Sequence, residues 1–157
     1  MRLTSSAFRQ GEAIPKRFTC DGEDVSPQLS WQDAPKETKA FAVIVHDPDA
    51  PRAEGFTHWL LYNIPPNVTS IQENVPKQAK VSHLGVQGLN DFGKLGYGGP
   101  CPPSGSHRYF VRLYALRKEL DLEPGTKAQQ VQEAISGIVI EQTELMGTYA
   151  RMKAKGA

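Results

Sequence analysis

Two aspartates follow directly after an apolar run of the chain. Asp47 and Asp49 alternate with Pro48 and Pro51 in the segment HDPDAP. Each proline fixes its own φ and pushes the preceding residue toward extended conformations, so this turn is predicted to be stiff. Asp-Pro is also a common way to start a turn, and an aspartate can cap its own turn. Considered alone, the segment favours a structural role.

Two histidines and a tyrosine stand at the start of other strand-like runs. His58 opens the run HWLLYNI, where a histidine is more often a core or rim residue than a ligand group. Residues 93–109 contain five glycines and three prolines and lead into His107 and Tyr109. Such glycines let backbone N–H groups point at a ligand, and a two-residue period puts His107 and Tyr109 on one face of a strand. An anion-binding loop and an ordinary surface loop are equally good interpretations of this segment.

Together these residue types suit a small anion. The imidazoles of His58 and His107, the hydroxyl of Tyr109 and the loop N–H groups can all donate hydrogen bonds to a phosphate. Asp47 could orient a histidine and raise its pKa, or Asp47 or Asp49 could pair with an ammonium group of the ligand. The same groups could perform acid–base chemistry, so an enzyme for a small phosphorylated or carboxylated substrate is the alternative to a binding protein.

No catalytic or metal motif accompanies these residues. The chain lacks the GxxxxGK phosphate loop and the GxSxG nucleophile elbow, and its four histidines follow no zinc spacing. Cys101 is the one candidate nucleophile, but a structural thiol is the commoner case. We therefore predict a non-catalytic protein with no catalytic residues, no metal and no cofactor.

The two cysteines and the N-terminus bear on the compartment. Cys20 and Cys101 lie 81 positions apart and form no C-x-x-C motif, so two reduced thiols are expected, with a disulfide between them as the alternative. No apolar stretch follows Arg2, so no secretory signal is expected. The longest apolar run, 41–45, is far shorter than the roughly 20 residues of a membrane span. These features predict a cytoplasmic protein without a membrane span.

Apolar runs predict strands in the first three quarters of the chain. The strongest lie at 40–47, 57–64 and 107–116, and weaker ones lie at 3–8 and 29–31. In the run 107–116, residues with odd numbers should share one face and residues with even numbers the other.

Helices are expected only in the last quarter. Thr126 and Gln129 form a capping-box pattern before apolar residues at helical spacing, and Gly137 would end that helix. A second periodic stretch, 139–152, predicts another helix. Strands first and helices last is the α+β pattern. We predict a mainly β fold with an antiparallel sheet core, a few peripheral helices and a helical C-terminal quarter.

Length and charge limit the classes of partner. The 157 residues point to a single domain, 1–157. Lys plus Arg is 18 and Asp plus Glu is 17, which leaves a net charge of +1. Binding to nucleic acid or anionic lipid depends on clustered excess positive charge, so a protein that coats either is not expected.

Three motifs, taken together, closely resemble one family. DPDAP at 47–51, HWLLYNIP at 58–65 and GPCPPSGSHRY at 99–109 resemble the phosphatidylethanolamine-binding protein family, in particular its bacterial and archaeal Raf-kinase-inhibitor-like branch. The resemblance implies an antiparallel β-sandwich with a few flanking helices. It also implies a small pocket for phosphate, acetate or a phosphoethanolamine head group, formed here by Asp47, Asp49, His58, Pro102, His107 and Tyr109.

The same resemblance implies a binding or regulatory function. The ligand would be a small anion or a phospholipid head group, and a protease or kinase inhibited by this protein is the second version of that function. The oligomeric state is left open, with a homodimer among the options. Family members often carry a cis peptide bond in the DPDAP turn, so one is expected before Pro51.

Overall fold

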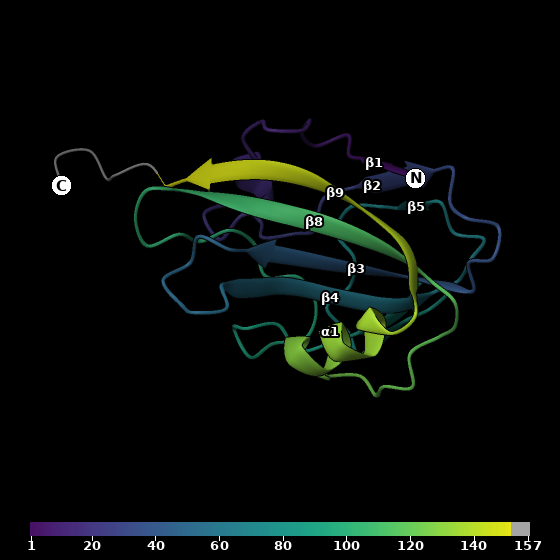
Figure 1. Ribbon diagram of the computed structural model, residues 1–157. Helices are drawn as coiled ribbons and strands as arrows, with labels where there is room; N and C mark the ends of the chain where they lie inside the picture. Colours follow the sequence, from purple (N-terminus) through teal and green to yellow (C-terminus); the bar gives the residue numbers. More distant parts are fainter. Residues whose placement is uncertain (152–157) are drawn as a thin grey trace, which may run out of the picture.

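The computed structural model describes residues 1–151 and folds them into two antiparallel sheets (Figure 1). The smaller sheet has the order β1-β2-β5, from β1 (Arg2–Thr4), β2 (Leu29–Gln32) and β5 (Ser70–Ile71). The larger sheet has the order β6-β7-β4-β3-β8-β9, from β6 (Lys80–Val81), β7 (Gly85–Gln87), β4 (Phe56–Ile64), β3 (Ala40–Asp47), β8 (Ser106–Leu116) and β9 (Val139–Ala150). A 3₁₀ turn, η1 (Lys16–Phe18), and one α-helix, α1 (Ala128–Ser136), complete these elements. Among the same residues, no helix is long and apolar enough to cross a membrane.

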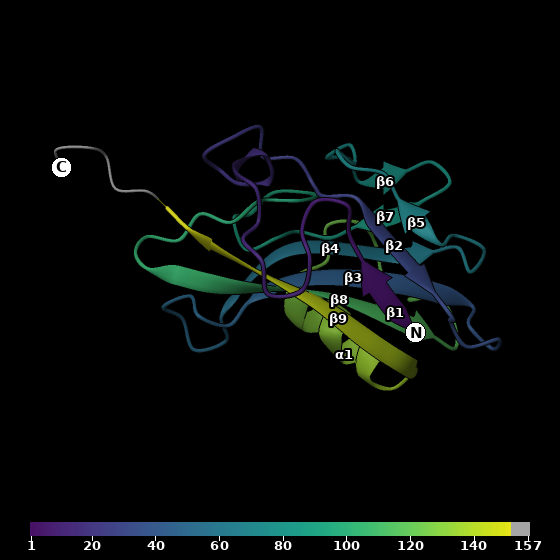
Figure 2. The same cartoon turned by 90° about the horizontal axis from the view of Figure 1, so that it is seen from above.

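The central strand β3 is covered on both faces. Its residues Phe41, Val43 and Val45 belong to the core that the large sheet shares with the small sheet. Ala42 and Ile44 belong instead to a second core under α1. Figure 2 shows the small sheet and α1 on opposite faces of the large sheet. Because both faces are buried, β3 is a continuous apolar run in the sequence instead of an alternating one.

The three strong strand predictions are confirmed. β3 spans the predicted residues 40–47, and β4 and β8 each begin one residue earlier than predicted. Along β8, His107 and Tyr109 are buried, whereas Arg108 is exposed and Phe110 half-buried, so the expected alternation is present. The mainly β, antiparallel character of the fold is therefore confirmed.

The predicted helical C-terminal quarter is wrong beyond residue 138. Residues 139–150 form β9, which pairs antiparallel with β8 along its whole length. The stretch also has a two-residue period, in which Leu145 and Gly147 turn toward the core. Pairing with β8 satisfies the backbone polar groups between the two strands, and this outweighs the helical spacing of the apolar residues. Met152, the last residue of the predicted helix, lies outside the described residues.

Helix α1 is confirmed, but its predicted cap is wrong. The residue before the helix is Lys127, and no side chain caps the free N–H groups. The hydroxyl of Thr126 donates to the carbonyl oxygen of Glu123 at 2.7 Å, so it closes the preceding turn instead of capping the helix. Gly137 ends the helix, as predicted.

Gly147 provides a test of the strand at the C-terminus. A Cβ atom at this position would lie 2.7 Å from Ile14 Cγ1 and 2.7 Å from Phe8 Cε2, both buried side chains. We expect Gly147→Ala to lower the free energy of unfolding by about 1–3 kcal/mol through overpacking. Gly137→Ala is the matched control, because its Cβ would meet open space. Urea unfolding measures both variants. A helix over 139–152 would give the opposite sign, since alanine stabilises a helix over glycine by about 1 kcal/mol.

Candidate functional site

One end of the large sheet gathers the polar residues of interest. Strand β3 ends at Asp47, which lies opposite Phe56 of β4, while His46 lies opposite Phe110 of β8. Because neighbouring antiparallel strands run in opposite directions, the end of β3 lies beside the starts of β4 and β8. A cavity of about 260 Å³ opens at this end of the sheet.

Five of the six residues predicted for the site line this cavity. They come from three strands and the loop before β8, and they are Asp47, His58, Pro102, His107 and Tyr109. The sequence separates Asp47 from His107 by 60 positions, yet the register of β3 with β8 brings them into contact.

The buried pair Asp47–His107 forms one side of the cavity. Asp47 Oδ2 lies 2.6 Å from His107 Nδ1, and the two residues are only 2% and 7% exposed. The second carboxylate oxygen of Asp47 accepts a hydrogen bond from the backbone N–H of Asp49 at 2.7 Å. A carboxylate can only accept, so Nδ1 of His107 carries the proton of this contact. Asp47 thus orients the histidine, as the sequence suggested.

His58 lies on the neighbouring strand and is held by backbone. Its Nδ1 is 2.7 Å from the carbonyl oxygen of Gly98, and the residue is 3% exposed. Burial lowers the pKa of His58, although the carbonyl of Gly98 and the charge of Asp47 act in the opposite direction. The neutral ring is therefore favoured in this environment.

Tyr109 carries the least satisfied polar group at the site. The residue is 1% exposed, and its hydroxyl is buried without any hydrogen-bond partner in residues 1–151. Burial, and then the charge and closeness of the Asp47 carboxylate, raise the pKa of Tyr109, so the hydroxyl stays protonated. Asp47 is the nearest acceptor group, but the contact does not have the geometry of a hydrogen bond. A buried hydroxyl without a partner costs free energy, and such groups in native proteins call for an explanation.

Asp49 does not line the cavity. Its carboxylate oxygens accept hydrogen bonds at 2.9 Å from the backbone N–H, Nε and Nη2 of Arg108. The bidentate contact with the Arg108 guanidinium lowers the pKa of Asp49 to about 2. Asp49 therefore fastens the turn after β3 to β8, and the predicted direct contact with a ligand is not supported by its position.

The turn after β3 differs from expectation in its peptide bond. Residues 1–151 contain no cis peptide bond, so the bond before Pro51 is trans. The trans form is favoured by about 0.5–1 kcal/mol even before proline, and the contact between Asp47 and the N–H of Asp49 closes the turn without a cis bond.

An aromatic and basic rim completes the cavity and was missed from the sequence. Phe56 and Phe92 pack edge to face with ring centroids 4.6 Å apart, and both rings lie beside His58. Arg52 lies over the ring of Phe56 at 5.3 Å and pairs with Asp91 at 3.5 Å. Phe92 is 44% exposed. The only sequence signal for it was its place in the segment NDFGKLGYGG, which leads into the Gly/Pro-rich loop.

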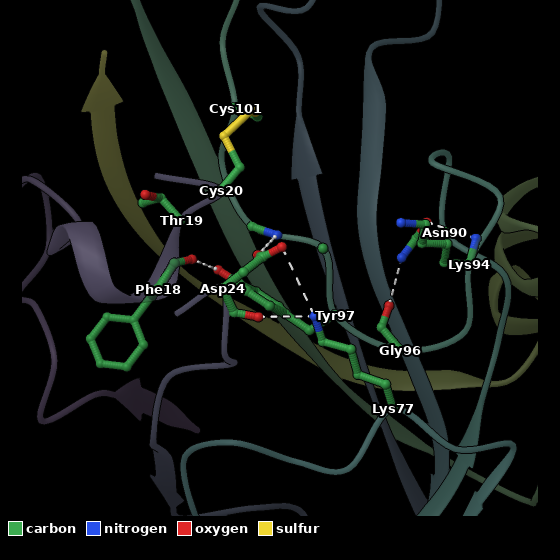
Figure 3. A network of polar contacts seen from close by, with 12 residues as sticks. Phe18, Thr19, Cys20, Asp24, Lys77, Asn90, Lys94, Gly96, Tyr97 and Cys101 are labelled. Atoms are coloured by element: carbon green, nitrogen blue, oxygen red, sulfur yellow. Dashed lines mark hydrogen bonds and ion pairs between the residues drawn. A yellow bond between two sulfur atoms is a disulfide. The ribbon is translucent and has the colours of Figure 1, made fainter. Parts of the chain in front are cut away.

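Cys20 and Cys101 form a disulfide, so the preferred expectation of two reduced thiols is wrong. Their Cα atoms lie 5.4 Å apart. The segment after η1 and the loop before β8 are brought together by hydrogen bonds that the sequence does not reveal. Figure 3 shows two of them: the hydroxyl of Tyr97 donates to the carbonyl of Phe18, and Asp24 accepts from the backbone of the loop.

The disulfide also borders the cavity, because Cys101 is one of its lining residues. Cys101 is therefore not a free nucleophile. Disulfides persist mainly in oxidising compartments, and inside cells mainly in hyperthermophiles. The disulfide is therefore a reason to test the expected cytoplasmic location, which stays a prediction.

Removal of the disulfide is expected to destabilise the protein. The bond closes a loop with a sequence separation of 81 residues. Its loss in Cys20→Ser/Cys101→Ser should lower the free energy of unfolding by about 2–4 kcal/mol, because the unfolded chain gains freedom. Urea unfolding with and without a reductant measures this, and the double variant is the control that a reductant should leave unchanged. A thiol-reactive label should not attach to the denatured wild-type protein when no reductant is present, as measured by mass spectrometry. Attachment of two labels would show that the disulfide is absent.

Comparisons with known proteins agree over nearly the whole chain. A sequence model of the family described as "Phosphatidylethanolamine-binding protein" matches residues 4–150. A UPF0098 protein of Methanothermobacter thermautotrophicus is 52% identical over 151 residues, which cover 96% of this chain and 99% of the relative. A UPF0098 protein of Aquifex aeolicus is 46% identical and covers 96% of this chain and 89% of its own length.

Two crystal structures are similar in fold as well as in sequence. CT736 from Chlamydia trachomatis, titled a phosphatidylethanolamine-binding protein homologue, is 44% identical with a TM-score of 0.86, covering 96% of this chain and 97% of its own. YbcL from E. coli, titled a new member of the mammalian PEBP family, is 33% identical with a TM-score of 0.91. The match covers 96% of this chain and 98% of YbcL. With this fold, these motifs and these relatives, the chain belongs to the phosphatidylethanolamine-binding protein family.

Proposed function

We propose that this protein is a non-catalytic binding protein whose cavity takes a small oxyanion, such as phosphate or the phosphate of a phosphoethanolamine-like head group. The observation that carries the proposal is the hydroxyl of Tyr109, which is buried at the cavity, protonated and without a partner in residues 1–151. The hydroxyl is sealed from solvent, so a small movement of the cavity wall would bring an oxygen atom of a ligand to it as the missing acceptor.

The size and lining of the cavity support a small ligand. At about 260 Å³ it lies just below the roughly 300–1,000 Å³ of pockets for drug-sized molecules. Its polar groups, from Asp47, His58, His107 and Tyr109, gather at the strand ends. Phe56, Phe92 and Pro102 add an apolar wall along which the substituent of a phosphate ester would lie.

A regulatory role through a partner protein, such as inhibition of a protease or kinase, is the second version of this proposal. The exposed ring of Phe92 beside the cavity is the feature that a partner would cover. Turnover of phosphate esters in an activity screen would instead favour the alternative acid–base enzyme.

Tyr109→Phe tests the central observation directly. The variant keeps the ring and removes the hydroxyl, so affinity for phosphate should fall roughly 2- to 13-fold, the equivalent of one hydrogen bond worth about 0.5–1.5 kcal/mol. The free energy of unfolding should stay equal or rise, because an unsatisfied buried group is lost. Isothermal calorimetry and urea unfolding measure the two effects. Tyr114→Phe, on the opposite face of β8, is the control and should bind as wild type does. Unchanged affinity in Tyr109→Phe would remove the main support for the site.

The two histidines should respond to the same anion. His58 and His107 both line the cavity, so each should lie within hydrogen-bonding reach of one phosphate. A hydrogen bond to a charged group is worth about 1.5–3 kcal/mol, so His58→Ala or His107→Ala should weaken binding by roughly 10- to 150-fold. An NMR titration of the imidazole signals with phosphate measures this, with His83→Ala in the exposed β6–β7 turn as the control. The site is wrong if neither histidine signal moves at saturating phosphate.

A further inference from the structure

The disulfide is part of the wall of the cavity. Cys101, Pro102 and Pro103 follow one another in the loop before β8, and all three line the cavity. Pro102 is buried, whereas Cys101 is half-buried and its sulfur is bonded to that of Cys20. Figure 3 shows the bond where this loop meets the segment after η1. A change at the disulfide therefore acts directly on the surface that a ligand would touch.

The segment on the Cys20 side of the bond is firmly held. Its next residue, Asp21, accepts a hydrogen bond from the hydroxyl of Tyr149 at 2.6 Å. A second one comes from Nη2 of Arg151 at 3.0 Å. Tyr149 belongs to β9, which pairs with β8. Cys20 is therefore attached to the sheet independently of the disulfide.

The segment on the Cys101 side is held mainly by the disulfide itself. The carbonyl of Pro100 accepts a hydrogen bond from the N–H of Cys20 at 3.1 Å, and Ser106 pairs with β9. Between these two points, residues 101–105 form no hydrogen bond with any other part of residues 1–151. The covalent bond and the packing of the buried Pro102 are what fix this stretch of the cavity wall.

Space for a small reductant exists on both sides of the bond. Cys101 lines the cavity of about 260 Å³. Cys20 lines a second cavity of about 240 Å³, together with Asp24 and Lys77. Both cysteines are half-buried. Thiol–disulfide exchange depends on access of a thiolate to one sulfur, so this bond is placed where a thiol can reach it.

We infer that the Cys20–Cys101 bond is a redox switch of the cavity: the disulfide form binds the ligand tightly, and reduction lowers the affinity. This inference rests on the proposed function. Reduction removes the covalent attachment of residues 101–105, while the hydrogen bonds of Pro100 and Asp21 remain. The wall at Pro102 then adopts the binding conformation for only part of the time, and the apparent affinity falls by that fraction.

A dithiol is the class of reductant that operates this switch. One of its thiolates attacks a sulfur of the bond, which forms a mixed disulfide and releases the other cysteine as a thiol. The second thiol of the reductant then attacks the mixed disulfide and releases the remaining cysteine. Two electrons and two protons pass to the protein, which gains two thiols, and the reductant leaves as a cyclic disulfide.

The ligand and the redox state influence each other by the same factor. If reduction weakens phosphate binding, saturating phosphate must favour the disulfide over the dithiol to the same extent. Couplings between sites in proteins are typically about 5- to 150-fold, and a tenfold coupling corresponds to about 30 mV for this two-electron couple. In surroundings rich in thiols the low-affinity form would be favoured, so oxidation would turn binding on.

The test measures phosphate binding to the intact protein by isothermal calorimetry in a buffer without phosphate. Wild type is titrated as the disulfide, after reduction with dithiothreitol, and after reoxidation. We expect the reduced protein to bind phosphate at least about fivefold more weakly, and reoxidation to restore the affinity. Cys20→Ser/Cys101→Ser is the matched control, which should bind as reduced wild type does, with or without dithiothreitol. In mixtures of reduced and oxidised dithiothreitol, saturating phosphate should shift the dithiol–disulfide equilibrium constant by the same factor, as measured by thiol labelling and mass spectrometry.

A measurement without ligand examines the wall itself. The ¹⁵N order parameters of Ser104 and Gly105 should fall below about 0.6 on reduction, while those of β3 and β8 stay near about 0.85. Equal phosphate affinity of the two redox forms would overturn the inference and leave the proposed function standing. Weaker binding accompanied by loss of the β3 and β8 signals would mean unfolding, which also overturns the switch. Absence of phosphate binding by the disulfide form would overturn both.

Discussion

The pocket depends on one buried contact, the hydrogen bond between Asp47 and Nδ1 of His107. A carboxylate that is 2% exposed is tolerated only when its oxygens are hydrogen-bonded, and here His107 and the N–H of Asp49 supply those bonds. The contact joins the last residue of β3, the turn after it and the start of β8. A slip of one residue in the pairing of β3 with β8 would move His107 and Tyr109 to the face of the sheet that carries α1.

The sequence predicted those parts of the fold and site that depend on local pattern. β3 follows from a continuous apolar run, and the placement of His107 and Tyr109 on one buried face follows from a two-residue period. The same reasoning failed for residues 139–150, where helical and two-residue spacings coexist. Only the presence of β8 as a partner decides between them, and pairing across 20 or more residues leaves no local signal.

The missed parts of the site have a common physical reason. Arg52, Phe92 and the Cys20–Cys101 bond reach the cavity through loops whose paths are determined by tertiary hydrogen bonds. Asp49 is the converse case: its type and spacing suited a ligand, but in the folded chain both of its carboxylate oxygens accept hydrogen bonds from Arg108. Residue type and order could therefore identify which residues gather at the strand ends. Only the folded chain distinguishes the residues that face the cavity from those, such as Asp49, that stabilise the turn beside it.

The disulfide determines whether the two fragments of a proteolytically cleaved chain can separate. Strands β2 to β7 all lie between Cys20 and Cys101 in the sequence, and the exposed turn residues 51–54 and 82–83 fall within this interval. A protease that nicks either turn would leave two fragments joined by a covalent bond and still paired in the same sheets. The cut chain would migrate as one species until it is reduced, and the fragment that carries β8 and β9 would stay attached to the N-terminal segment that packs against it.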